Sequence, residues 1–167
     1  MERVMENDFI PMIRALWNEQ KNRELLYLEA LKKDSMGSFR RILSQGHVSA
    51  VLFQKEIRWI YDYFKCFLED KELADNQISS MASLQMLENL TEKEDIASCL
   101  KKLEAATLQL YKALCTYMDR EYEIKRMLDE HLIRISEFYD ALCKMEVSNR
   151  KNLEVGDRKK MVYVVAA

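Results

Sequence analysis

The sequence contains very little glycine and proline, with three glycines and one proline in 167 residues. Turns depend on these residues, because glycine reaches positive φ angles and proline fixes φ near −65°. A fold with many tight hairpins is therefore excluded. Hydrophobic residues make up 49% of the chain and charged residues 32%, a composition typical of long helices joined by few connections. The length is that of one domain with a core of its own.

The charges show no excess of one sign, since 26 basic residues face 28 acidic ones and the formal net charge is −2. Proteins that bind nucleic acid usually present a basic face, so no nucleic-acid partner is expected. No stretch approaches the 18 uncharged apolar residues of a membrane span, and the N-terminal "MERVMENDFIPM" lacks the apolar region of a signal peptide. The chain is therefore expected to be cytoplasmic, without a membrane partner.

The four cysteines, at positions 66, 99, 115 and 143, include no CxxC pair. Each stands among apolar residues at helical spacing, where a free thiol behaves as a small hydrophobic group. Neither a zinc site nor a disulfide framework is expected. The three glycines form no phosphate-binding loop, and no cysteine has a flanking histidine. No cofactor, no small-molecule substrate and no catalytic residue is therefore predicted, and the protein is expected not to be an enzyme.

Apolar residues recur at spacings of three and four, which predicts four amphipathic helices. Asn7 or Asp8 is the expected cap of the first, with Pro11 in its first turn, and "TEKE" reads as a capping box of Thr91 and Glu94. The predicted helices cover about residues 9–33, 38–70, 91–118 and 121–147, with a weak helical turn in the connection 71–90. Residues 148–167 read as a polar C-terminal tail that ends in a β-branched run.

The lengths of the connections predict the topology. Short breaks near 34–37 and 119–120 make the first and last helix pairs antiparallel, while the connection of about twenty residues can travel the length of a bundle. The sequence therefore predicts an all-α fold over residues 1–147. Its expected form is an antiparallel four-helix bundle with one long crossover between the second and third helices, the ferritin-like arrangement.

A repeated spacing predicts polar residues inside this bundle. Gln20 lies seven positions before Tyr27, and Glu104 lies seven positions before Tyr111. Seven residues are two turns of one helix face, so the first and third helices look like equivalent members of a duplicated pair. Gln20, Tyr27, Glu104 and Tyr111, together with Glu24, are the predicted interior polar residues.

The stretches "RELLYLEALKK", "LKKLEAATLQLYKAL" and "HLIRISEFYDALCK", with the crossover between them, carry a resemblance over about residues 9–146. The chain resembles the ferritin-like superfamily, and within it a bacterial family of small four-helix-bundle proteins of unknown function with a rubrerythrin-like layout. This resemblance implies a di-iron or di-manganese centre, which needs a Glu-x-x-His motif on two helices and a glutamate on each of the other two.

The sequence lacks that ligand pattern, because no glutamate has a histidine three residues after it. Ser44 and Leu128 stand three residues before the two histidines. A metal site is therefore not expected. The alternative is a metal-binding oxidase or storage protein with a degenerate carboxylate site, and its candidate ligands are Glu24, Glu56, Glu104 and Glu137.

His47 offers a second alternative, since histidine phosphotransfer domains are also four-helix bundles with a histidine on a helix. Those domains place a basic residue soon after the histidine, whereas here the next one is Lys55. An ordinary histidine at the helix surface or boundary is the favoured interpretation. The neighbouring Gly46 should cost its helix about 1 kcal/mol.

The favoured functional hypothesis is a non-catalytic helical bundle that acts through association with itself or with another protein. The segment "IRWIYDYFKCFL" is apolar on more than one face of its helix, which indicates cover on two sides. That cover is either another segment of the chain or a second subunit, so the protein is a possible oligomer. The interface candidates are Trp59, Tyr61, Tyr63 and Phe67.

Overall fold

The computed structural model describes the backbone of residues 2–33, 37–65, 80–118 and 121–165, and the side chains of 9–33, 37–64, 83–118 and 121–146. Every regular element in these ranges is an α-helix, which confirms the all-helical prediction. The helices are α1 (Glu2–Leu31), α2 (Phe39–Lys65), α3 (Ser80–Glu88), α4 (Lys93–Tyr117) and α5 (Tyr122–Val165). None of these described helices has both the length and the apolar character needed to cross a membrane.

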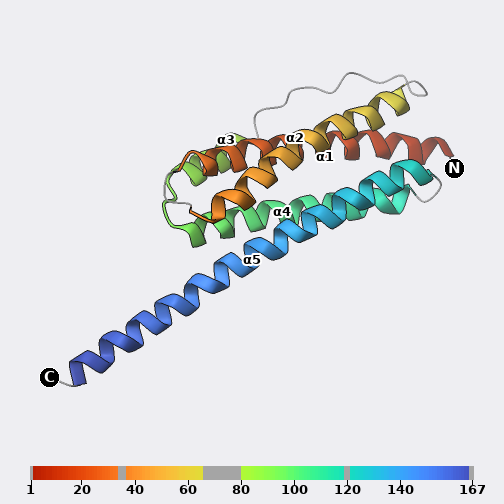
Figure 1. Ribbon diagram of the computed structural model, residues 1–167. Helices are drawn as coiled ribbons and strands as arrows, with labels where there is room; N and C mark the ends of the chain where they lie inside the picture. Colours follow the sequence, from red (N-terminus) through yellow and green to blue (C-terminus); the bar gives the residue numbers. More distant parts are fainter. Residues whose placement is uncertain (1, 34–36, 66–79, 119–120, 166–167) are drawn as a thin grey trace.

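The four long helices lie side by side in two antiparallel pairs (Figure 1). α1 packs along α2, α4 packs along α5, and contacts between α1 and α4 join the two pairs. α4 starts at the end of the molecule where α1 ends and α2 begins, so α2 and α4 run in the same direction (Figure 1). The short α3 packs against α1 at that end.

Two apolar clusters fill the interior, one toward each end of the helices. The first includes Ile13, Leu16, Ile57, Leu114 and Leu128, all fully buried. The second surrounds the start of α2 and α4 and contains Leu26, Phe39, Leu43, Ile96 and Leu100, again buried. A band of polar side chains from all four long helices lies between the two clusters.

α1 begins earlier than the sequence indicated. The helix starts at Glu2 and continues through Pro11, so Asn7 and Asp8 lie within it and do not cap it. A proline inside a helix removes one backbone hydrogen bond. Residues 2–8 contain no glycine or proline, and the helix tolerates the loss at the exposed Pro11.

The predicted capping box at Thr91 is wrong. The N-cap of α4 is Glu92, with φ −83° and ψ 137°, and no side chain caps the helix. Because the helix begins at Lys93, Thr91 lies one residue too early to accept from the first-turn amides. The acidic Glu94 and Asp95 stand in the first turn, where negative charge interacts favourably with the helix dipole.

The other predicted boundaries differ mainly at the C-terminus. Residues 148–165 were expected to be a polar tail, but α5 continues to Val165 and extends past the other helices (Figure 1). Gly156 is the one glycine in this stretch and proline is absent from it, so nothing in the local sequence terminates the helix. The predicted helical turn in the connection corresponds to α3, and the predicted end of the second helix, residues 66–70, lies outside the described residues.

Candidate functional site

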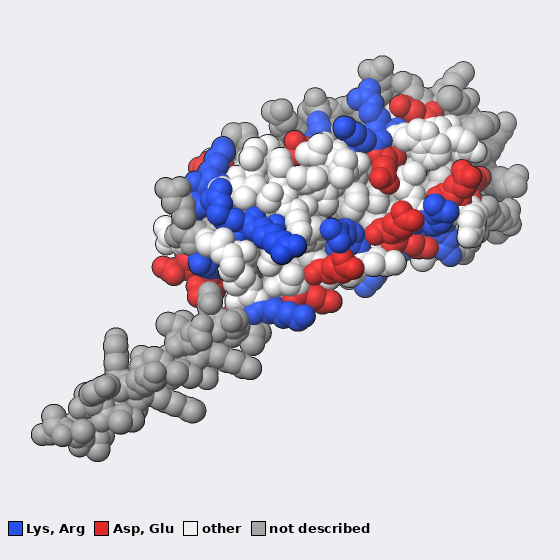
Figure 2. All heavy atoms as spheres, viewed as in Figure 1, with Lys and Arg blue, Asp and Glu red and all other residues white. Residues whose placement is uncertain are grey.

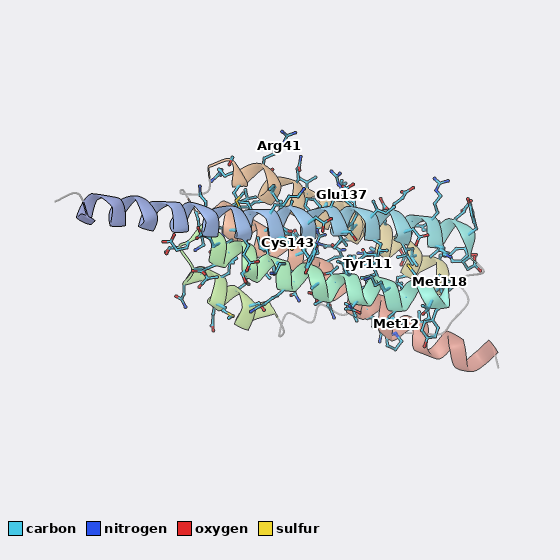
Figure 3. The ribbon with its side chains drawn as sticks, turned by 90° about the horizontal axis from the view of Figure 1, so that it is seen from below. Met12, Arg41, Tyr111, Met118, Glu137 and Cys143 are labelled. Carbon is cyan, nitrogen blue, oxygen red and sulfur yellow. The ribbon has the colours of Figure 1, made fainter. Side chains whose placement is uncertain are left out.

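The buried polar band begins with two reciprocal hydrogen bonds between α1 and α4. Gln20 Nε2 donates to the Tyr111 hydroxyl at 2.8 Å, and the Tyr27 hydroxyl donates to Glu104 Oε1 at 2.9 Å. All four side chains are fully buried, and Tyr111 lies between the helices in Figure 3. Because the two helices are antiparallel, each member of one Gln/Glu-to-Tyr spacing bonds the opposite member of the other. The structure therefore brings together four of the five predicted interior residues.

Arg23 occupies the centre of this band and is fully buried. Its Nε donates to Glu104 Oε1 at 2.8 Å, its Nη1 to Gln20 Oε1 at 2.8 Å and its Nη2 to Ser49 Oγ at 3.2 Å. The guanidinium carbon also lies 5.6 to 5.8 Å from the ring centroids of Tyr27, Phe53 and Phe138. A buried cation needs such partners to repay its lost hydration. We call the set formed by Gln20, Arg23, Tyr27, Ser49, Glu56, Glu104, Tyr111 and His131 the buried polar network.

The electrostatics of the network favour a charged Arg23–Glu104 pair. Burial acts to lower the pKa of Arg23, but attraction to Glu104, the hydrogen bond to Glu104 and the nearby tyrosines together outweigh it, so the pKa lies above its ordinary value. Burial and the Glu104 carboxylate raise the pKa of Tyr27, so its hydroxyl remains protonated. Glu104 Oε2 is buried and has no hydrogen-bond partner among the described residues. Loss of the guanidinium would therefore leave a carboxylate with a single remaining donor, the Tyr27 hydroxyl.

His131 of α5 connects the interior to the surface. Its Nδ1 lies 2.8 Å from the Tyr111 hydroxyl, and its Nε2 lies 2.8 Å from Glu56 Oε2. The Glu56 side chain is 44% exposed, whereas that of His131 is 2% exposed. Phe53 stacks on the imidazole with 3.8 Å between ring centroids. The network thus runs from a surface carboxylate to the buried ion pair.

The hydrogen-bond directions determine the tautomer of His131. Arg23 donates to Gln20 Oε1, so the Gln20 amide nitrogen donates to the Tyr111 oxygen. The proton of Tyr111 is then directed to His131 Nδ1, and Nε2 carries the imidazole proton that Glu56 accepts. Burial lowers the pKa of His131 below 6.5, although the bond to Glu56 opposes the shift. A second proton on the imidazole would face the Tyr111 hydroxyl, whose own proton then loses its acceptor.

The residues present do not fit the metal centre that the ferritin-like resemblance implies. In the part of the chain that the structure describes, no three His, Cys, Asp or Glu side chains are grouped to hold a metal ion. A guanidinium stands at the centre of the helices, and its positive charge repels a divalent cation there.

The four carboxylates predicted as candidate metal ligands each have a different partner. Glu104 pairs with Arg23, Glu56 with His131, and Glu137 with the exposed Arg134 of its own helix. Glu137 lies on the outside of α5 (Figure 3). Glu24, the fifth predicted interior residue, is half-buried and accepts from Gln54 Nε2 at 2.7 Å, so it is not part of the network.

His47 lies within α2, at the boundary between the interior and the surface, beside an unusually close contact. It is part-buried, and its Nδ1 lies 3.1 Å from the backbone oxygen of Glu24. The adjacent Gly46 is buried under the Tyr27 ring, where a Cβ would lie 2.6 Å from Tyr27 Cδ1 and Cζ. Glycine is therefore required at this position for space, because the ring occupies the volume of the missing side chain.

α2 carries an exposed apolar surface on its outer face. Val48 and Leu52 are each 51% exposed, Trp59 is 48% exposed and Tyr63 is 39% exposed. At about 100° per residue these four positions fall within about 60° of the helix circumference, and Trp59 stacks on Tyr63 with 6.0 Å between ring centroids. We call these four residues the α2 surface. In Figure 2 uncharged side chains form a continuous area over this helix, with charged residues of both signs around it.

The predicted interface candidates divide between this surface and the core. Trp59 and Tyr63 belong to the α2 surface, whereas Tyr61 is 2% exposed and packs in the first apolar cluster. A residue buried within its own chain cannot contact a partner, so Tyr61 is not an interface residue. Phe67 lies outside the described residues.

Two hollows accompany these features. A groove of about 260 Å³ lies beside the α2 surface, between α2 and α5, lined by residues that include Gln45, Val48, Phe53 and Arg134. A larger cleft of about 560 Å³ lies between α1, α3 and α4, with Leu26, Leu103 and Glu19 among its lining residues. Burial and the nearby Glu104 raise the pKa of Glu19, so its carboxyl group is protonated more readily than usual.

Two central members of the network, Arg23 and His131, were missed in the sequence. Arg23 lies three positions after Gln20 and four before Tyr27, and His131 stands between Leu128 and Ile135 in the inward stripe of its helix. The spacing therefore contained the signal. Residue type obscured it, because arginine and histidine are far more often exposed than fully buried.

Comparison with known proteins finds no match of this chain to a family model, to a curated protein or to a solved structure. Its function is therefore inferred from its own geometry.

Proposed function

We propose that this protein is a non-catalytic helical protein that functions through self-association, with the α2 surface as the contact between copies. The observation that carries this proposal is the alignment of four large, half-exposed apolar side chains on one face of one helix. Exposed apolar side chains scattered singly are common, but contiguous patches mark interaction sites. Tryptophan and tyrosine are also the residue types enriched in the energetic centres of protein interfaces.

The size of the surface supports a contact with a second copy. A large apolar side chain buries up to ~150–250 Å², so each half-exposed member of the α2 surface leaves on the order of 100 Å² to cover. Two copies then bring together on the order of 800 Å² of apolar area. A standard interface of about 1,600 Å² is somewhat more than half apolar, so the α2 surface supplies the apolar part of such an interface.

The buried polar network supports the non-catalytic part of the proposal. Its hydrogen bonds join side chains of this chain to one another in a consistent donor-to-acceptor order. Such a network specifies one arrangement of the four helices, because a misaligned helix would leave buried polar groups unpaired. We infer that it has a structural role, and that it stands where a metal centre would lie in a ferritin-like protein.

A ferritin-like arrangement of the four long helices is part of the same proposal. Its support is the direction of the helices: two antiparallel pairs, with α2 and α4 running the same way (Figure 1). That order requires the chain to return along the length of the molecule between α2 and α4, as ferritin-like folds do.

Sedimentation velocity tests the proposed self-association. The protein is measured from about 1 to about 100 µM, the range over which a complex with a Kd in the micromolar range forms. We expect the sedimentation coefficient of the unmodified protein to rise with concentration, and the variant Leu52→Asp to remain monomeric throughout. The matched control is Leu28→Asp on α1, where Leu28 is 39% exposed and lies on a different helix.

The control should associate like the unmodified protein. A monomer at every concentration, or equal behaviour of the two aspartate variants, would overturn the proposal. Circular dichroism establishes that each variant is folded. If Leu52→Asp unfolds, Leu52→Ser makes the same comparison with Leu28→Ser.

A further inference from the structure

The α2 surface has an internal symmetry that determines how two copies can meet. Val48 and Tyr63 lie equally far from the midpoint between Lys55 and Glu56, and Leu52 and Trp59 do so as well. All four apolar side chains are exposed on the same face. A helix face with such mirrored positions matches itself when the second helix runs in the opposite direction.

We propose, building on the proposed self-association, that the protein forms a closed two-fold dimer in which the α2 helices of two copies pack antiparallel about the midpoint between Lys55 and Glu56. In this register Val48 of each copy meets Tyr63 of the other, and Leu52 of each copy meets Trp59 of the other. Every contact occurs twice, which is the property of an isologous interface. Because both α2 surfaces are consumed, the assembly ends at two copies.

The charged residues at the midpoint, Lys55 and Glu56, lie on the two flanks of the α2 surface, about 50° to either side of its centre at about 100° per residue. Because antiparallel helices bring each flank against the same flank of the other copy, Lys55 of one copy lies beside Lys55 of the other on one side of the axis, and the two copies of Glu56 lie together on the opposite side. Lys55 is exposed, and Glu56 is 44% exposed while its Oε2 accepts from His131. Both residues reach solvent at the edges of the interface, where salt screens the repulsion between like charges. The register is therefore carried by the four apolar side chains between the two flanks, and not by these charges.

The groove beside the α2 surface gives each end of this dimer an aromatic contact. The groove of about 260 Å³ between α2 and α5 is lined by residues that include Val48, Leu52 and Phe53. In the antiparallel register Tyr63 of the second copy reaches the Val48 end of the helix, next to the groove. Gln45 and Arg134 also line it and offer polar groups to the tyrosine hydroxyl, as buried tyrosines require.

Disulfide trapping tests the register. At about 1.5 Å per residue, the two copies of residue 55 are offset by only ~1.5 Å along the antiparallel helices, whereas the two copies of residue 48 lie ~22 Å apart. A disulfide needs Cα atoms within about 7 Å. Lys55→Cys and the double variant Val48→Cys with Tyr63→Cys should therefore form covalent dimers under mild oxidation, and Val48→Cys alone should not.

The measurement is non-reducing electrophoresis followed by peptide mass spectrometry, which assigns each disulfide to its two cysteines and separates the engineered bonds from those of the native cysteines. A disulfide between two copies of residue 48, or species larger than dimers in sedimentation, would overturn the proposed geometry. So would dimers in sedimentation without either expected disulfide, but this result would leave self-association intact. A protein that is monomeric at all concentrations would overturn both proposals.

Discussion

Removal of the buried guanidinium is the most direct test of the interior. In Arg23→Met the side chain keeps much of its length, but Glu104 loses its 2.8 Å donor and Gln20 Oε1 loses its own. Glu104 would then keep only the Tyr27 hydroxyl as a donor. Breaking one partner of a buried pair costs about 3–5 kcal/mol of the free energy of unfolding. Because domains are stable by about 5–15 kcal/mol, the variant should fold with much reduced stability.

The double variant Arg23→Met with Glu104→Leu separates the charge from the other contacts. It removes the unpaired carboxylate but leaves the Tyr27 hydroxyl and Gln20 Oε1 without their partners, at about 1–3 kcal/mol each. The expected loss is thus about 2–6 kcal/mol, below the ~6–10 kcal/mol sum of two single changes at about 3–5 kcal/mol each. The double variant should therefore be close to the single variants in stability, and not cumulatively worse.

Urea unfolding followed by circular dichroism at the helix band measures these free energies, with the slope of the transition as a check that the unfolding remains two-state. A loss below about 1 kcal/mol for Arg23→Met would refute the reasoning. It would mean that Glu104 is protonated or hydrated in the folded protein, and that the ion pair does not hold the interior in place.

Two further changes probe the remaining contacts. Gly46→Ala should lower the free energy of unfolding by about 1–3 kcal/mol, although alanine has the better helix propensity, because the new methyl group overlaps the Tyr27 ring. Urea unfolding measures the loss. Adding Tyr27→Leu should remove most of the penalty that the clash causes. The free energy of unfolding should also fall as the pH drops below about 6.5. In that range the histidine of the unfolded chain binds a proton, whereas the buried His131 of the folded protein, whose pKa is lowered, remains neutral to a lower pH. Each proton of difference changes stability by up to ~1.4 kcal/mol per pH unit. His131→Gln, which retains one acceptor and one donor, should flatten this dependence in urea unfolding at a series of pH values, and an unchanged slope would show that another group causes it.

Much of the architecture follows from periodicity alone. The helices and the polar interior positions Gln20, Tyr27, Glu104 and Tyr111 are visible as spacings of three, four and seven, because a helix must turn one face inward. The cross-pairing of the two spacings follows once the helices are known to be antiparallel. Spacing does not say which oxygen or nitrogen of a side chain meets which partner, because the order of donors and acceptors depends on how the four helices pack.

The burial of Arg23 could not be read from its type. An arginine is buried only where several acceptors and aromatic rings converge on it, and here they come from three other helices. Such convergence is a property of the packed helices and not of any local segment. The predicted end of the last helix is wrong for a different reason, since the polar composition of residues 148–167 indicates a tail although no residue there breaks a helix, and α5 continues to Val165.

Gly46 has a consequence for the outer face of the molecule. A slide of α2 by one turn, about 5.4 Å, would carry either Ile42 or Ala50 under the Tyr27 ring in place of the glycine. Both residues have a Cβ that would clash with the Tyr27 ring. Only one axial position of α2 along α1 is therefore sterically allowed. The absence of a Cβ at Gly46 in the interior thereby also fixes the axial position of Trp59 and Tyr63 on the outer face of the same helix.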